Sequence, residues 1–256
     1  MPQQSEHSGR RILCVFAHPD DETAGAGGTI ARYAAEGVAV HVITATRGEQ
    51  GSLGPDDRVI AREELPIVRE TELRSALVLL GAHPPVLLDY RDGEVADADF
   101  LELVGKVSAH MDEVNPDVVI TFGPTGITDH PDHKTMHQAT VEAFHRYTER
   151  VGNHARLLYF AIPPEIAREF ELEIEGPEAV PNVVVDISDV LTLKLKALRI
   201  HGSQMDIQEM TDKIEAGLKW DSETFHQALP PVPDGDVTQG LWSEGYQHRC
   251  RVEVGI

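Results

Sequence analysis

The sequence contains very little cysteine. Cys14 and Cys250 are the only two cysteines among its 256 residues. Two cysteines near opposite ends of a chain provide neither a disulfide framework nor a thiolate metal cluster. Any metal that this protein binds is therefore expected to be held by histidine and carboxylate side chains.

Basic side chains are scarce relative to acidic ones. The chain has 22 Lys and Arg against 43 Asp and Glu, which gives a formal net charge of −21. A field of this sign repels phosphate backbones, so we expect no nucleic-acid partner. It also disfavours a highly anionic substrate unless a local arginine receives it. Solubility is the simplest reason for the acidic excess.

Long apolar runs are absent as well. No run approaches the ~18 residues that a membrane-spanning helix needs. The first residues, MPQQSEHSGRR, lack the apolar core of a signal peptide, and we expect residues 1–10 to form a short disordered leader. These observations predict a cytoplasmic protein without a membrane span. The length suits one large α/β domain, residues 11–256, better than two small ones.

The most informative stretch begins with a short apolar run at residues 12–17, of the kind that a buried parallel strand needs. The polar residues HPDDE follow it directly, at positions 18–22. Pro19 keeps His18 out of the helical region, so the chain turns at the strand's carboxyl end, where ligands bind in open α/β sheets. A metal site and a helix start with surplus charge are the two interpretations. The second explains one acidic residue well and His18 not at all.

Hydrophobic periodicity and capping residues predict alternating strands and helices along the rest of the chain. The expected strands are 38–46, 86–88, 117–122, 157–162 and 183–187. The expected helices are 23–36, 66–80, 97 or 99 to 114, 133–147, 188 or 189 to 201, and an amphipathic segment at 207–218. A final extended piece is expected between 241 and 254. This order predicts a Rossmann-like, doubly wound, mainly parallel sheet in a single domain, with the chain after about residue 160 covering or lengthening the sheet.

Two features near the first helix bear on cofactors and substrate. Gly25, Gly27 and Gly28 do not have the G-x-G-x-x-G spacing of a dinucleotide loop, so no nucleotide cofactor is predicted. These glycines are expected to let the helix approach its neighbours closely. Arg47, just after the second strand, could bind a substrate oxygen or carboxylate. A surface ion pair with Glu49 is an equally good interpretation.

The fourth strand opens into a second polar cluster, GPTGITDHPDHK, at residues 123–134. Because the strand ends meet at one edge of the sheet, His18, Asp21 and His133 can form a three-ligand metal site with an open position for water. Asp20 is then left beside the metal as a base for that water. His130 is left on the opposite side, where an imidazolium could stabilise an oxyanion and protonate a leaving amine.

These motifs resemble those of the LmbE-like, PIG-L-type zinc deacetylase family. The two principal matches are A-H-P-D-D-E at 17–22 and H-P-D-H-K at 130–134. Lesser matches are T-R-G-E at 46–49, R-E-T-E-L-R-S-A-L-V-L-L-G at 69–81 and H-G-S-Q at 201–204. The resemblance covers residues 11–205 in order. Family members remove acetyl groups from N-acetylglucosamine units in glycolipid, pseudo-disaccharide thiol and antibiotic precursors, and some cleave related amides.

The resemblance implies a role for each matched residue. It implies Zn²⁺ as the cofactor, and ligands this mixed also suit another divalent metal such as Fe²⁺. Oligomeric state is left open, with a homo-oligomer as one expectation from related proteins. The implied roles are zinc ligation by His18, Asp21 and His133, general base catalysis by Asp20, acid or electrostatic assistance by His130 with Asp132 as its orienter, and substrate contact by Arg47.

The chain departs from the family at one place. Several members have Tyr-Gly immediately before the second motif, and that tyrosine helps to hold the tetrahedral oxyanion. Thr128 and Asp129 stand there in this sequence. Either another donor takes over or the substrate differs, and the charge of Asp129 disfavours an anionic aglycone. Glu22 has two equal interpretations, orientation of His18 and support of the helix start.

The sequence therefore predicts a zinc-dependent hydrolase. It would remove an N-acetyl group from an N-acetylglucosamine-containing small molecule or glycoconjugate, with metal-activated water and Asp20 as general base. An amidase of the same fold, acting on a thiol conjugate or another amide, is the alternative. A non-catalytic sugar- or metal-binding module is the alternative from another class, and it needs neither Asp20 nor His130.

Overall fold

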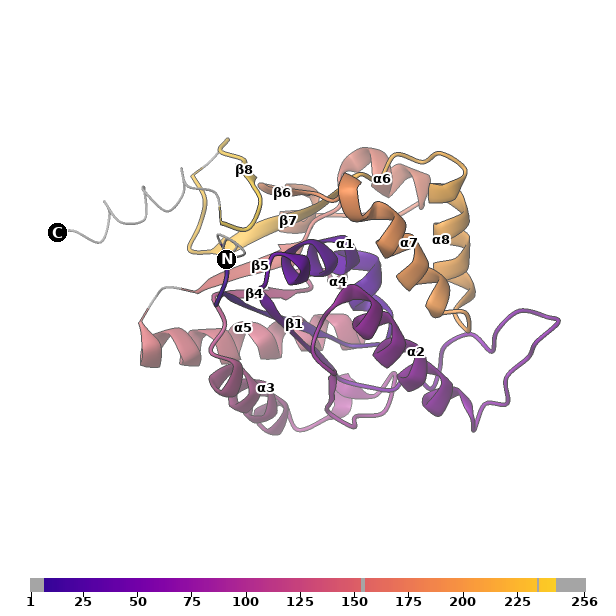
Figure 1. Ribbon diagram of the computed structural model, residues 1–256. Coiled ribbons are helices and arrows are strands. Elements are labelled where there is room, and N and C mark those ends of the chain that lie inside the picture. The colour runs from indigo at the N-terminus through magenta and orange to yellow at the C-terminus, as the bar shows by residue number, and fades with distance from the viewer. Residues whose placement is uncertain (1–6, 153–154, 234, 243–256) are drawn as a thin grey trace, which may run out of the picture.

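The computed structural model describes residues 7–152, 155–233 and 235–242. Within them one sheet of eight strands has the order β3-β2-β1-β4-β5-β7-β6-β8 (Figure 1). The strands are β1 (Arg11–Phe16), β2 (Ala39–Thr44), β3 (Val86–Leu87), β4 (Val118–Thr121), β5 (Arg156–Phe160), β6 (Val183–Asp186), β7 (Ser222–Leu229) and β8 (Thr238–Gln239). The first five strands run parallel to their neighbours in this group. The predicted mainly parallel, Rossmann-like α/β fold is confirmed.

The strand order reverses between β1 and β4. From β1 the chain proceeds outward through β2 to β3, whereas β4 lies on the other side of β1 and leads to β5. The residues that follow β1 and β4 therefore flank a crevice at the carboxyl edge of the sheet, the usual ligand position in such folds. Both strands are completely buried apart from one end residue of β1, so the crevice has a rigid floor.

Helices cover both faces of the sheet (Figure 1). The helices α1, α2 and α7 pack together on one face, with α8 against α7, and α3 packs against α5 on the other face. The helices are α1 (Asp21–Ala35), α2 (Leu65–Leu80), α3 (Phe100–Val114), α4 (Gly126–Asp129), α5 (Pro131–Val151), α6 (Pro164–Glu169), α7 (Leu191–Ile200) and α8 (Met205–Glu215). The described residues also form short 3₁₀ helices at η1 (Val95–Asp97), η2 (Gly176–Ala179) and η3 (Ser188–Val190).

The glycines of α1 allow close packing, as expected. A Cβ at Gly25 would overlap the ring of Phe160 on β5, and one at Gly28 would lie 2.7 Å from Ile187 atoms. Helix α1 can therefore lie close to β5 and to the end of β6. This packing brings the start of α1, which carries the HPDDE turn, near the later half of the chain.

The strand β7 was not predicted, because its pattern is unusual. It pairs antiparallel with both β5 and β6, and its buried positions include Glu223 and Gln227 beside Phe225. A strand with polar residues on its buried face lacks the apolar alternation that marks strands in a sequence. The carboxylate of Glu223 is accommodated by Lys194, at 2.6 Å, in an ion pair that is fully buried.

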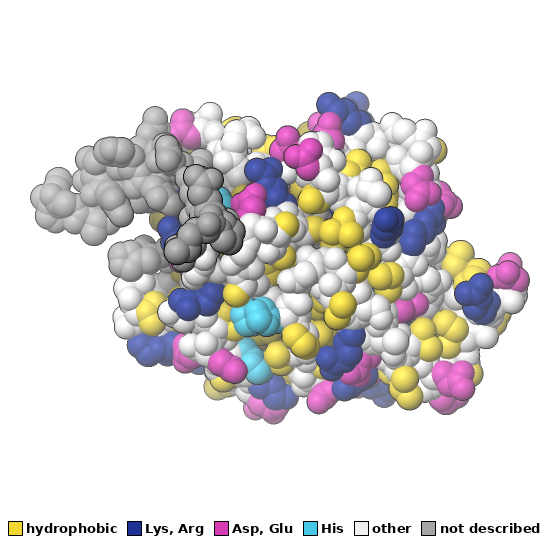
Figure 2. Space-filling view, in the orientation of Figure 1, with side chains coloured by type: hydrophobic (Ala, Val, Ile, Leu, Met, Phe, Trp, Pro, Cys, Tyr) yellow, Lys and Arg dark blue, Asp and Glu magenta, His cyan; other side chains and the backbone are white. Residues whose placement is uncertain are grey.

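The surface carries many charges close to charges of opposite sign. On the face shown in Figure 2, Lys and Arg side chains lie mostly beside Asp and Glu side chains. No helix in the described part of the chain is long and apolar enough to cross a bilayer. Most of the predicted leader and nearly all of the predicted final extended piece lie outside the described residues. The predicted location in the cytoplasm stays a prediction.

Candidate active site

The HPDDE turn is held by its own side chains. The Asp21 carboxylate accepts hydrogen bonds from the N–H groups of Ala17, at 3.2 Å, and His18, at 2.7 Å. Asp20 has φ 116° and ψ −28°, a conformation that non-glycine residues rarely adopt. Such strained residues persist where the surrounding structure fixes them, and they cluster at functional sites. The turn thus presents Asp20 and Asp21 at fixed positions beside His18.

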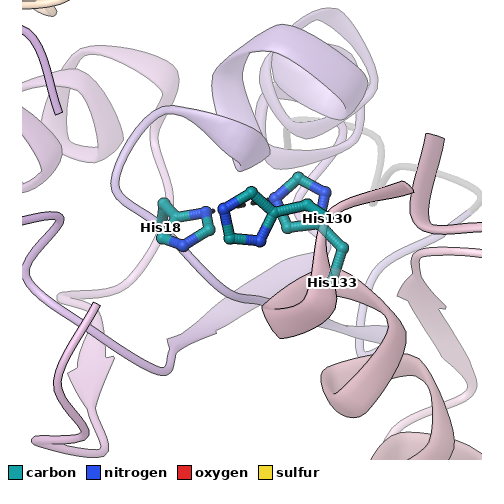
Figure 3. A group of neighbouring side chains, drawn as sticks. All are labelled: His18, His130 and His133. Carbon is teal, nitrogen blue, oxygen red and sulfur yellow. Dashed lines mark hydrogen bonds between the residues drawn. The ribbon is translucent and has the colours of Figure 1, made fainter. Parts of the chain in front are cut away.

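The three predicted metal ligands lie together. The Nδ1 atom of His18 is 3.1 Å from Nε2 of His133 (Figure 3), and each of these nitrogens is 3.6 Å from an Asp21 carboxylate oxygen. His133 comes from the first turn of α5, and its Nδ1 lies 3.0 Å from the Gly126 carbonyl oxygen. That nitrogen therefore carries the proton, which leaves the Nε2 lone pair pointing towards His18 and Asp21.

Two further carboxylates bind the far side of His18. Its Nε2 atom is 3.0 Å from Asp92 and 3.3 Å from Asp132. Burial alone would lower the His18 pKa, but hydrogen bonds to Asp132 and Asp92 and the charge of Asp21 raise it to about 10. Burial alone would raise the pKa of the Asp92 carboxyl. The hydrogen bond to His18 and the charge of His18 outweigh burial and lower this pKa to about 2.

These contacts fit a divalent cation. Two imidazole nitrogens and one carboxylate form a common donor set for zinc and for other first-row metals. An environment that strongly stabilises a positive charge on His18 would stabilise a cation at its Nδ1 atom as well. The Asp92 and Asp132 carboxylates would then hold His18 by its other nitrogen, as carboxylates do around metal-binding histidines.

The position of Asp132 corrects one expectation. We expected its carboxylate to orient His130, but it accepts hydrogen bonds from the backbone of Gly93 and Val95 and contacts His18. The carboxylate of Asp132 is thus engaged by those N–H groups and by the His18 ring. The hydrogen bond between Asp132 and His130 is a different one: the backbone N–H of Asp132 donates to Nδ1 of His130, at 3.2 Å. The ring of His130 still lies near the ligands, 4.8 Å from the His18 and His133 ring centroids.

The Asp20 carboxylate forms an ion pair, whereas the sequence analysis expected it to stand without a partner beside the metal. Its Oδ2 atom is 2.7 Å from Nη2 of Arg69, a buried side chain of α2. Arg69 also donates to the carbonyl oxygens of Pro19, at 2.5 Å, and Gly48, at 2.9 Å. Burial raises the pKa of Asp20 to about 7, and Arg69 opposes that rise.

Arg47 occupies a different place from the one expected. It forms ion pairs with Glu70 and Asp89, and not the pair with Glu49 that was the alternative. The cavity beside the three ligands is lined by Arg69 and not by Arg47. The arginine at this site is therefore on α2, within the R-E-T-E-L match, and sequence reasoning missed it.

Glu22 contacts neither His18 nor solvent. Its fully buried carboxylate accepts from the Asp20 N–H, at 3.1 Å, and the Thr23 hydroxyl, at 2.6 Å, and lies 3.3 Å from Nε2 of His201. Burial alone would lower the pKa of His201, and the hydrogen bond to Glu22 raises it. Glu22 thus supports the strained Asp20 peptide and connects α1 to the H-G-S-Q segment.

The ligands open into a cavity of about 810 Å³. Its lining includes Thr128, at the position where several family members have tyrosine. The next residue, Asp129, has φ 59°, a left-handed conformation that glycine adopts without cost. Its carboxylate forms an ion pair with Lys134, so the negative charge that we expected beside the cavity is largely compensated.

Asp92 is the second functional candidate that the sequence analysis missed. Polar residues follow β3 just as they follow β1, β2 and β4. The rule that strand ends meet at one sheet edge applies to β3 as well, and it could have found Asp92. The signal for Arg69 was its position at the start of the R-E-T-E-L match, in the second turn of α2.

Comparison with known proteins places the chain in a family. The sequence pattern of the GlcNAc-PI de-N-acetylase family, PIG-L, matches residues 13–144. The chain is also 34% identical over 240 residues to the 1D-myo-inositol 2-acetamido-2-deoxy-alpha-D-glucopyranoside deacetylase of Mycolicibacterium smegmatis, with 79% of this chain and 83% of that one covered. The chain belongs to the GlcNAc-PI de-N-acetylase family, so the predicted family and the prediction of an enzyme are confirmed.

Solved structures agree with this placement. The fold is similar to that of an N,N'-diacetylchitobiose deacetylase from Pyrococcus horikoshii, with a TM-score of 0.63, 26% identity and coverage of 88% of this chain and 86% of that one. The 4-carboxy-2-hydroxymuconate hydratase GalB from Pseudomonas putida has a TM-score of 0.64 at 20% identity, with 88% and 99% covered. Since a hydratase shares this fold, the reaction must be argued from the residues of the site.

Proposed function

We propose that this protein is a metal-dependent hydrolase that removes the N-acetyl group from an N-acetylglucosamine-containing small molecule or glycoconjugate. The observation that carries the proposal is the convergence of His18, Asp21 and His133 beside the Asp20–Arg69 pair in one cavity. The M. smegmatis relative and the P. horikoshii structure, both named as deacetylases of acetylated amino sugars, support it.

His18, Asp21 and His133 would hold the cation through Nδ1, a carboxylate oxygen and Nε2 respectively. Zinc suits this donor set, and Fe²⁺ is the alternative. When bound, the cation would supply a Lewis acid for the amide carbonyl and would lower the pKa of a coordinated water. Asp92 and Asp132 hold His18 from its other nitrogen and so keep its Nδ1 directed at the site.

Asp20 is the proposed general base. It lines the cavity next to Asp21, and a carboxylate whose pKa is raised by burial accepts a proton more readily than an ordinary one. Arg69 fixes the orientation of this carboxylate by its hydrogen bond to Oδ2, while the other oxygen remains available for the attacking water. The strained backbone of Asp20 and the Glu22 bond to its N–H fix the carboxylate further.

His130 is the proposed electrostatic partner of the reaction, as a hydrogen-bond donor to the oxygen of the scissile amide. Its Nδ1 accepts the N–H of Asp132, so the neutral ring carries its proton on Nε2. Both His130 and Thr128 line the cavity. His130 can thus donate a hydrogen bond from Nε2 to the carbonyl oxygen as charge develops there, while the proton that Asp20 takes from the water passes to the amine nitrogen as the C–N bond breaks.

The proposal is tested by measuring free-amine release from N-acetylglucosamine and its conjugates, including the inositol conjugate, with zinc-loaded and Fe²⁺-loaded protein. Asp20→Asn should reduce release by at least about 10²-fold while the bound metal stays constant. The exposed carboxylate Asp89, which pairs with Arg47 outside the cavity, provides the control Asp89→Asn. If protein with one metal per chain releases no amine from any acetylated sugar, the deacetylase proposal is wrong, and an amidase on another amide or a binding module takes its place.

A further inference from the structure

The cavity continues well beyond the polar site. Its lining includes six large apolar side chains from α6 and the residues that flank it, from α8 and from the segment that precedes β7. We call this region the apolar arm. Its members are Ile162, Ile166, Phe170, Ile207, Met210 and Trp220. We propose that the apolar arm binds an apolar aglycone, an alkyl or aryl group attached to the acetylated amino sugar. This inference rests on the proposed function, and it specifies the substrate class.

The aromatic side chains of the apolar arm are held in place. The rings of Phe170 and Trp220 lie 5.7 Å apart between centroids, inclined at 60°. The ammonium of Lys213 lies 4.8 Å from the Phe170 ring, and that of Lys194 lies 5.0 Å from the Trp220 ring. Such cation–π contacts stabilise an aromatic ring in one position. The Lys194 contact is the more rigid of the two, because that lysine is also fixed by its buried ion pair with Glu223.

The apolar arm and the polar site belong to one cavity. Arg69, Gln204 and Ile207 all line it, and so does Phe160, whose ring lies against Gly25 near the start of α1. A volume of about 810 Å³ falls within the range that accepts drug-sized ligands, and it exceeds what one acetylated hexosamine needs. A substrate whose amide lies at His18 and His133 therefore leaves the apolar arm for whatever the sugar carries.

The chemistry of the apolar arm favours an uncharged apolar group. Burying apolar surface against it is favourable in proportion to the area removed from water. A polyhydroxylated group such as inositol would instead lose hydrogen bonds to water there without finding partners. The exposed charged residues of the lining, Glu165, Asp206 and Lys219, carry more negative than positive charge and disfavour an anionic group. We therefore expect this chain to differ in aglycone preference from its inositol-glycoside relative.

The first experiment measures kcat/KM for methyl, butyl and hexyl N-acetylglucosaminides. We expect an increase of about two- to fourfold for each methylene until the apolar arm is full. Met210→Ala should flatten this dependence of kcat/KM on the length of the alkyl group. Met205→Ala is the matched control, because Met205 lies on the same helix, is 42% exposed and does not line the cavity. Phe170→Ala gives a second variant of the apolar arm in case one of them fails to fold.

The second experiment is independent of hydrolysis. In Trp242→Phe protein, Trp220 becomes the only tryptophan, since the sequence has two. Trp242 packs against Tyr33 at 5.0 Å and does not line the cavity, so its loss leaves the apolar arm intact. Hexyl glucoside, which has no amide to cleave, should change Trp220 fluorescence saturably, and methyl glucoside should not. Met210→Ala in this background should weaken hexyl glucoside binding by at least about fivefold.

The two experiments separate the two claims. Hydrolysis of every glycoside at the same kcat/KM, without fluorescence change by hexyl glucoside, would overturn the apolar arm and leave the deacetylase proposal standing. Saturable hexyl glucoside binding without hydrolysis of any acetylated sugar would support the apolar arm as a binding site and overturn the deacetylase proposal. A chain-length dependence that survives in both Met210→Ala and Phe170→Ala would also overturn the apolar arm.

Discussion

The Nη2 atom of Arg69 lies 2.7 Å from Oδ2 of Asp20, and the same nitrogen also donates to the Pro19 carbonyl. The arginine thereby fixes the proposed base and its backbone at once. Arg69→Ala removes the larger of the two positive charges, Arg69 and His201, that lower the pKa of this buried carboxylate, so the pKa of Asp20 should rise further. We expect kcat/KM at neutral pH to fall by about 10²-fold, with a smaller deficit at high pH. Arg47→Ala, which alters an arginine outside the cavity, should change it by less than about threefold.

The pH dependence of the reaction follows from the same carboxylate. Asp20 acts as a base only when it is ionised, and burial raises its pKa to about 7. A neighbouring divalent cation lowers that value, so kcat/KM should decrease tenfold per pH unit below a midpoint at or below about 7. Measurement from pH 4.5 to 8 with constant metal content tests this. A profile that stays flat through this range would show that Asp20 is not the base.

The carboxylate behind His18 should control metal affinity. Asp92 is 5% exposed, and its carboxylate lies 3.0 Å from Nε2 of His18, so that it orients the His18 ring. Asp92→Asn should weaken zinc binding by about 10- to 100-fold, as the loss of such partners does around other metal-binding histidines. Competition with a chelator measures the affinity, and Asp89→Asn is the control. Unchanged affinity in Asp92→Asn would remove Asp92 from the proposed site.

Removal of the metal should abolish amine release and lower thermal stability. Any ligand that binds only the folded state stabilises it by mass action, and the cation would offset the repulsion among the carboxylates around His18. Dialysis against a chelator should therefore decrease Tm, and Zn²⁺ should restore both Tm and activity. His133→Ala should eliminate the zinc-dependent part of Tm. Full activity after the metal has been removed to less than a tenth per chain would contradict the proposal.

Glu178 should stabilise the loop that positions His133. Its buried carboxylate accepts hydrogen bonds from the backbone and the hydroxyl of Thr125, and the next residue, Gly126, contacts His133 through its carbonyl. Glu178→Ala leaves those donors without their partner and should cost about 1–3 kcal/mol of unfolding free energy. The exposed Glu175 gives the control Glu175→Ala, with less than about 0.5 kcal/mol expected. Denaturant unfolding of both variants measures the difference.

Much of the fold and the three proposed ligands could be predicted from the sequence, because the signals are local. Apolar runs of strand length, Gly81 at the end of α2 and Asp99 at the start of α3 all mark elements that the structure contains. The spacing of His18 and Asp21 in one turn, with His133 just after the fourth strand, needed only the rule that parallel strands end at one edge.

Tertiary structure alone decided the partners of these residues. Arg69 reaches Asp20 from the second turn of α2, and Asp132 turns to His18 because distant backbone N–H groups face its carboxylate. The strand β7 and the apolar arm depend on packing between segments far apart in the chain. A sequence pattern records which residues share one face of an element. It does not record which other element packs against that face, and here that packing set the partner of the proposed base and the shape of the cavity.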